Sequence, residues 1–186
     1  QKRMKLMPDL SLLPESMMAR EAMGDPVAWG KQNRDRLAAA LDTVDLALHR
    51  FGEARLPLER ALKSADALQR LWALTACTCF GEEAKPLASL AKGLLQDPEE
   101  LVRVRAIEFL GLIGAIDPQA AFVPLVNETA DPILATEALN SVVWFRDFLA
   151  KPVERSAFTR SLRGGDVDAR LNYLNGIPYP PKKKRK

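Results

Sequence analysis

Two stretches of this sequence repeat one another at an offset of 33 residues. The stretch LQRLWALTACTCFG (68–81) matches LVRVRAIEFLGLIG (101–114) at a leucine, an arginine, a large aliphatic residue, an alanine and a final glycine. A third copy, PILATEALNSVVWF (132–145), follows after a slightly shorter connection. Each copy has helical spacing of its apolar residues and follows a shorter segment with the same spacing. A helix pair that recurs at this interval is typical of an α-solenoid.

The sequence therefore predicts an all-α fold, arranged as a right-handed α-α superhelix or short solenoid of antiparallel helix pairs. We expect a helical domain over residues 25–175, an irregular leader over residues 1–24, and a disordered tail rich in proline and lysine over residues 176–186. Within the helical domain, the repeats are expected at about 54–81, 84–114 and 118–145, with a cap of two short helices at 151–175.

The segment ahead of the repeats has clear helix signals. In residues 25–52, Asp25 is a predicted N-cap, Pro26 suits the first helical position, and Gly52 is a predicted stop. Spacings of four, three and four residues place one apolar stripe on this predicted helix, formed by Leu37, Leu41, Val44 and Leu48.

The clearest repeat unit is DPEELVRVRAIEFLGLIG (97–114). Asp97 can cap the second helix of the pair, and Pro98 suits its first turn. The predicted inward stripe consists of Val102, Ala106, Leu110 and Ile113. Two surface ion pairs are predicted on the same helix, Glu99 with Arg103 and Arg105 with Glu108.

The order D-P-x-x-x-V-R-x-x-A inside a helix pair resembles the HEAT family of repeats. In that family the Asp and the Arg help to tie adjacent repeats, so the resemblance implies that Asp97 and Arg103 are structural ties. The third copy has Ala135 at the position of the arginine, and the same tie is not expected there.

The charge of the chain is concentrated in its last five residues. The formal net charge is +3, and KKKRK (182–186) alone contributes +5, so the remainder is near −2. A nucleic-acid-binding domain normally spreads positive charge over its folded surface. The slightly negative charge of residues 1–181 argues against specific nucleic-acid binding. The tail nevertheless has the form of a nuclear import signal. No run of 18 apolar residues is present, which excludes an ordinary transmembrane helix.

No catalytic, cofactor-binding or metal-binding residues are predicted in this chain. It contains no glycine-rich phosphate loop, no H-E-x-x-H and no G-x-S-x-G. The lone histidine, His49, lacks partners for a catalytic triad or a metal site. Cys77 and Cys79 are two residues apart on a predicted helix and point in different directions, so we expect two free thiols.

The second helix of each solenoid repeat lines the concave face, where a partner can bind. Arg70, Trp72 and Arg105 lie on these predicted helices and are candidate contacts for a partner. The alternative for Trp72 is that its large ring fills space between repeats, and we favour that interpretation.

Five stretches together resemble the C-terminal region of bacterial sulfatases of the alkaline-phosphatase type, in which a helical HEAT-type extension follows the catalytic domain. The resemblance covers residues 9–146. It lies in DLSLLPESMMAREAMGDPVAWG (9–30), RLAAALDTVDLAL (36–48), RLWALTACTCFGEEAKP (70–86), DPEELVRVRAIEFLGLIG (97–114) and ILATEALNSVVWF (133–145).

The resemblance implies a non-catalytic module with a structural or interaction role. The family's catalytic domain uses calcium and a formylglycine made within a C/S-x-P-x-R motif, which this chain lacks. The leader is then a linker from a catalytic domain absent here, because the chain starts at Gln1. The expected partner is that domain or another protein, including a second copy of the chain. The expected compartment is the periplasm or the outside of the cell.

Two alternatives remain open. One is a freestanding HEAT-like scaffold that binds a protein partner, which places the chain in the cytoplasm. The other, suggested by the tail alone, is a nuclear or nucleic-acid adaptor.

Overall fold

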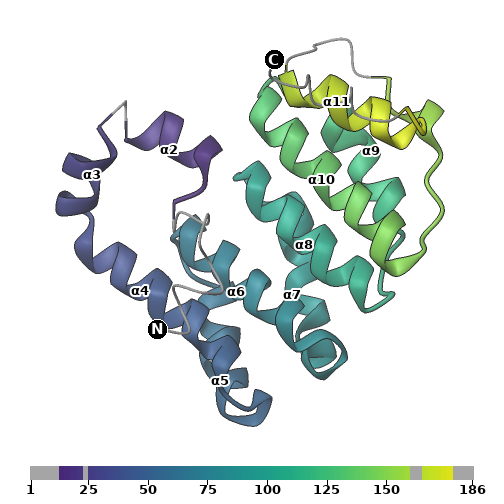
Figure 1. Ribbon diagram of the computed structural model, residues 1–186. Coiled ribbons are helices and arrows are strands. Elements are labelled where there is room, and N and C mark those ends of the chain that lie inside the picture. Colours follow the sequence, from purple (N-terminus) through teal and green to yellow (C-terminus); the bar gives the residue numbers. More distant parts are fainter. Residues whose placement is uncertain (1–12, 23–24, 160–164, 178–186) are drawn as a thin grey trace, which may run out of the picture. The chain divides into compact units, whose positions relative to one another are not determined.

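The computed structural model describes residues 13–22, 25–159 and 165–177 (Figure 1). These residues form helices joined by turns and short extended segments, and no strand occurs among them. The predicted all-α character is therefore confirmed. One helical domain is predicted over residues 25–175, and the structure divides the chain into two compact units, one ending at Ile113 and the other beginning at Gly114.

The first unit contains seven labelled α-helices among its described residues. They are α2 (Glu15–Glu21), α3 (Pro26–Gln32), α4 (Arg34–Asp45), α5 (Phe51–Leu62), α6 (Ala67–Phe80), α7 (Ala88–Gly93) and α8 (Glu100–Leu112). Three 3-10 segments connect them, at Leu46–Leu48, Gly81–Leu87 and Leu94–Gln96.

The helix predicted over residues 25–52 is interrupted. Asp25 caps α3 as expected, since its side chain accepts a hydrogen bond from the Ala28 amide at 2.8 Å. The helical run then breaks at Asn33 and ends near His49, which has an extended backbone. Gly52 lies in the first turn of α5, so its predicted role as a helix stop is wrong.

The described part of the leader is helical, which corrects the expectation of an irregular segment. Helix α2 spans seven residues, and Met17 on its buried side is 1% exposed. Burial of Met17 and Leu13 explains why this Met-rich stretch folds, although it has few helix signals. Residues 1–12 and 23–24 lie outside the described part.

Helix α6 packs against α4, α5 and α8, and the core of the first unit lies along α6 and α8. Each residue of the predicted inward stripe on α8 is at most 4% exposed. The glycine that ends both copies of the repeat also has a physical reason. Gly81 and Gly114 have φ of 57° and 66°, a region that side chains disfavour.

The second unit contains α9 (Pro118–Glu128), α10 (Pro132–Leu149) and α11 (Gly165–Leu174), and α10 packs against both of the others. A helix was predicted over residues 151–162. The described residues 151–159 instead form an extended segment with one 3-10 turn, Arg155–Ala157. The helix predicted over residues 166–175 corresponds to α11. Most of the tail, residues 178–186, lies outside the described part.

Candidate functional site

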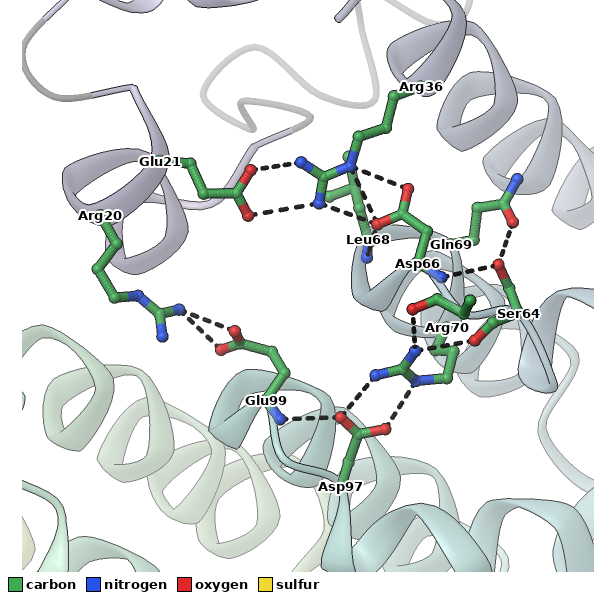
Figure 2. Close-up of polar contacts among 11 residues, drawn as sticks. Arg20, Glu21, Arg36, Ser64, Asp66, Leu68, Gln69, Arg70, Asp97 and Glu99 are labelled. Carbon is green, nitrogen blue, oxygen red and sulfur yellow. Dashed lines mark hydrogen bonds and ion pairs between the residues drawn. The ribbon is translucent and has the colours of Figure 1, made fainter.

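A cluster of charged side chains in the first unit lies at the N-terminal ends of α6 and α8 (Figure 2). We call it the arginine network. Its members are three arginines and four acids from α2, from α4 and from the starts of α6 and α8: Arg20, Glu21, Arg36, Asp66, Arg70, Asp97 and Glu99.

Arg70 and Asp97 form the buried part of the arginine network. Arg70 Nε donates to Asp97 Oδ2 at 2.7 Å, and Nη2 donates to Oδ1 at 2.8 Å. The remaining guanidinium nitrogen donates to the Ser64 and Ala65 carbonyls at 2.8 and 3.0 Å. The side chains of Arg70 and Asp97 are only 11% and 3% exposed. A buried charge pair is tolerable when its hydrogen-bonding groups are satisfied in this way.

Asp97 also connects this pair to the start of α8. Its Oδ1 accepts the Glu99 amide at 2.9 Å. The Glu99 carboxylate in turn accepts the Leu101 amide and caps the helix. The Arg70–Asp97 pair therefore joins α6 to the beginning of the next long helix.

Arg36 of α4 makes a second connection of this kind. Its Nε donates to both oxygens of Asp66, at 3.0 and 2.9 Å. Asp66 is itself the N-cap of α6, through the Leu68 amide at 3.0 Å. Arg36 also donates to Glu21 of α2 and lies 5.5 Å from the centre of the Trp29 ring. Hydrogen bonding to Asp66 is the main cause that raises the pKa of Arg36.

Arg20 completes the arginine network. Its Nη2 lies 2.8 and 2.9 Å from the two carboxylate oxygens of Glu99, while its Nε donates to the Ser16 carbonyl at 3.1 Å. Asp66 and Glu99, the acids that cap α6 and α8, thus each also form an ion pair with an arginine. Each carboxylate satisfies helix amides and a guanidinium at once.

The two residues implied as ties by the HEAT resemblance lie in different settings. Asp97 pairs with Arg70, as described above. Arg103 pairs within its own helix, with Glu100 at 3.1 Å, and its buried Nε has no hydrogen-bond partner among the described residues. The predicted pair of Glu99 with Arg103 is wrong because Glu99 binds Arg20.

The three candidate partner contacts offer little surface. Trp72 is 3% exposed, so its ring lies in the core. This agrees with the favoured interpretation, in which the ring fills space inside the protein. Arg70 is drawn inward by Asp97 and is likewise enclosed, which corrects its interpretation as a surface contact. Arg105 is half-buried and forms the predicted pair with Glu108, at 2.6 Å.

Cys77 and Cys79 are free thiols in the structure, as predicted. Cys77 is buried at the C-terminal half of α6, and this burial raises its pKa to about 12. Cys79 is exposed. His49 lies 3.8 Å from Glu53 on the surface. Within the described ranges, no three residues among His, Cys, Asp and Glu are placed to hold a metal ion.

The second unit contains a pocket of about 380 Å³ that sequence reasoning missed. The buried residues Phe122 and Phe145 line it, and the extended segment 151–154 forms one wall. Gln119 holds this wall in place: its Oε1 accepts the Glu154 amide at 2.7 Å, and its Nε2 donates to the Glu154 carbonyl at 3.4 Å. The lining of the pocket is mainly apolar and includes the charged residues Asp117, Lys151 and Glu154.

Sequence reasoning also missed Arg20, Glu21, Arg36 and Asp66. One signal could have found Arg36. It follows Asn33 by three residues, much as Arg70 follows the N-cap Asp66 by four, so an arginine recurs near the starts of α4 and α6.

Comparisons of this chain with protein-family models, curated proteins and solved structures find no match. Among the helices formed by described residues, none combines the length and apolar character needed to cross a bilayer.

Proposed function

We propose that this chain is a helical accessory module with a structural or protein-binding role, whose helix pairs form a short superhelix of the HEAT type. The observation that supports the proposal most is the buried, fully bonded Arg70–Asp97 pair between α6 and the start of α8. The Arg36–Asp66 pair links α4 to the start of α6 in the same way. In a solenoid each repeat contacts only its neighbours, so contacts between adjacent repeats contribute much of the stability. Buried links of this kind suit that arrangement.

The more specific form of this proposal is the non-catalytic C-terminal extension of a sulfatase-like enzyme. The similarity of residues 9–146 to such extensions supports it, together with a charged cluster that binds helices to one another. The module's partner would be the catalytic domain of the same protein, in the periplasm or outside the cell. Calcium and formylglycine would belong to that domain, and we assign no residue of this chain to them.

A freestanding protein-binding scaffold is the second candidate, and exposed apolar side chains favour it. Phe148 on α10 is 77% exposed, and Leu56 on α5 is 66% exposed. Large exposed apolar side chains suit a surface that a partner covers. The partner in this case is another protein or a second copy of the chain.

The gene itself separates the two candidates. We would sequence the DNA upstream of the codon for Gln1. An open reading frame that continues upstream and encodes a C-x-P-x-R or S-x-P-x-R motif supports the sulfatase extension. A start codon close to Gln1 contradicts it and leaves the scaffold.

A binding experiment then tests the role. If the reading frame continues, the catalytic portion and residues 13–177 are made separately, mixed, and analysed by size-exclusion chromatography. Co-elution supports an accessory role, and Phe148→Ser should weaken it if α10 provides the contact. Arg55→Gln, a change on the exposed side of α5, is the matched surface control. Separate elution of the two wild-type parts contradicts a stable accessory contact.

A further inference from the structure

Helix α2 carries an arginine and a glutamate side by side, and they reach opposite charges on different parts of the first unit (Figure 2). Arg20 binds the Glu99 carboxylate at the start of α8. Glu21 accepts from both terminal nitrogens of Arg36 on α4. Exchanging the two residues would place like charges together at both contacts. The arrangement therefore specifies the position and direction in which α2 docks.

The ion pairs of α2 are far more exposed than the pair beneath them. The Arg20 side chain is 57% exposed and that of Glu21 is 32% exposed, whereas Asp97 in the buried pair is 3% exposed. Salt screens exposed charges strongly and buried pairs much less. Ionic strength should therefore weaken the attachment of α2 while it leaves the Arg70–Asp97 pair intact.

Helix α2 also has little stability of its own. It is seven residues long, and its N-cap residue, Pro14, makes no side-chain cap bond. Helices shorter than about 12 residues are marginal in water without tertiary contacts. The contacts that keep α2 folded are thus its tertiary contacts, which include the two ion pairs and the burial of Met17 and Leu13. Weakening the ion pairs should therefore increase the fraction of molecules in which α2 is both released and unfolded.

We propose that α2 is a latch that Arg20 and Glu21 hold to the start of α8 and to α4, and that opens more often at high ionic strength. Release uncovers the Glu99 carboxylate and the guanidinium of Arg36. The core formed by α4, α5, α6 and α8 stays folded, because its own apolar contacts and the Arg70–Asp97 pair remain buried. This property does not depend on the proposed function of the chain.

Hydrogen exchange of the whole chain tests the latch. We expect amide exchange in residues 18–22 to rise about two- to thirtyfold between 0.05 M and 1 M NaCl, the range that two exposed ion pairs support. Amides of α6 should change much less. Equal protection of α2 at both salt concentrations would overturn the proposal. An equal rise in α6 would also overturn it, because it would mean that the whole unit opens.

Variants identify the charges responsible. In Arg20→Gln/Glu21→Gln, α2 should already exchange rapidly at low salt and should respond little to added salt. Arg20→Lys keeps the charge and should restore part of the protection that Arg20→Gln loses. The matched control is Arg55→Gln, which removes the exposed Arg55–Glu59 pair of α5 and should leave the salt response of α2 unchanged. If Arg20→Lys behaves as Arg20→Gln does, or the control abolishes the salt response, the latch proposal is wrong.

Discussion

The two units join their helices by different means at the same place in the repeat. In the first unit, Arg70 lies four residues after the N-cap Asp66 and reaches Asp97 ahead of α8. In the second unit, Ala135 lies four residues after the N-cap Asp131 and is 0% exposed. The first unit fills this position with a bonded charge, and the second fills it with a methyl group.

The polar contacts of α9 in the second unit are of another kind, while charged side chains also link α10 to α11 there. Amide side chains of α9 bind the backbone of the extended segment that follows α10. Asn127 donates to the Ala157 carbonyl at 3.0 Å and accepts the Thr159 amide at 2.9 Å. Gln119 holds Glu154 in the same two-point manner. One helical repeat pattern thus accommodates charged links between helices as well as neutral side-chain clamps on a connection.

Breaking the buried charge link should have the largest effect. Asp97→Ala leaves the Arg70 guanidinium buried without its counter-charge, so we expect a loss of about 3–5 kcal/mol in the free energy of unfolding. Urea denaturation followed by circular dichroism measures it. Arg55→Ala removes one side of an exposed pair and should change stability by less than about 1 kcal/mol. A similar small change for Asp97→Ala would mean that the link contributes little.

The N-cap aspartates sharpen the comparison between the units. Asp66 caps α6 and also binds Arg36, whereas Asp131 caps α10 through the Ile133 amide at 2.8 Å. Asp131→Ala should therefore cost about 1 kcal/mol, the usual value of a cap. Asp66→Ala should cost about 2 kcal/mol, because a charged hydrogen bond is lost as well. Equal losses in thermal or urea unfolding would remove the distinction between these two caps.

The neutral clamp of the second unit should contribute less than the buried charge link. Asn127→Ala removes two hydrogen bonds to partly exposed backbone groups, and we expect a loss of about 1 kcal/mol. Hydrogen exchange should locate the effect in residues 154–159. Val123, a partly exposed neighbour on α9, offers a matched control as Val123→Ala. Faster exchange across the first unit but not in residues 154–159 would contradict the clamp.

The smallest expected effect concerns Asp147 on α10. Arg146 Nε donates to it at 2.7 Å and is the main cause that lowers its pKa, with Tyr173 adding a second hydrogen bond. A lowered pKa favours the charged form in the folded state. Its contribution is present above the unfolded pKa and is lost as pH falls through the folded pKa.

NMR titration of the Asp147 carboxyl should therefore give a pKa below the ordinary value of about 3.9. Arg146→Gln should raise it toward that value. An unchanged pKa in Arg146→Gln would show that the neighbouring arginine is not the cause.

The helices of this protein could be predicted largely from the sequence because their signals are local. Asp25, Asp117 and Asp131 each precede a proline and each caps a helix. Apolar spacing alone identified the buried stripe of α8. These features depend on neighbouring residues along one helix, so no knowledge of the tertiary packing was needed.

The arginine network could not be predicted in the same way. Arg20 and Glu99 are 79 residues apart, and Arg36 and Asp66 are 30 apart, so their pairing depends on how the helices pack. Arg103 shows the difficulty most clearly. It matches Arg70 in sequence, yet Arg70 makes the link to Asp97 and Arg103 binds Glu100 in its own helix.

The central claim is that a buried charge pair joins α6 to the start of α8 in the first unit. A double-mutant cycle of Arg70→Ala and Asp97→Ala, measured by urea unfolding, tests it most directly. The account predicts that the double variant is at least about 2 kcal/mol more stable than the sum of the two single losses implies, because removing both charges leaves neither one buried alone. Additive losses, within about 0.5 kcal/mol, would contradict the claim.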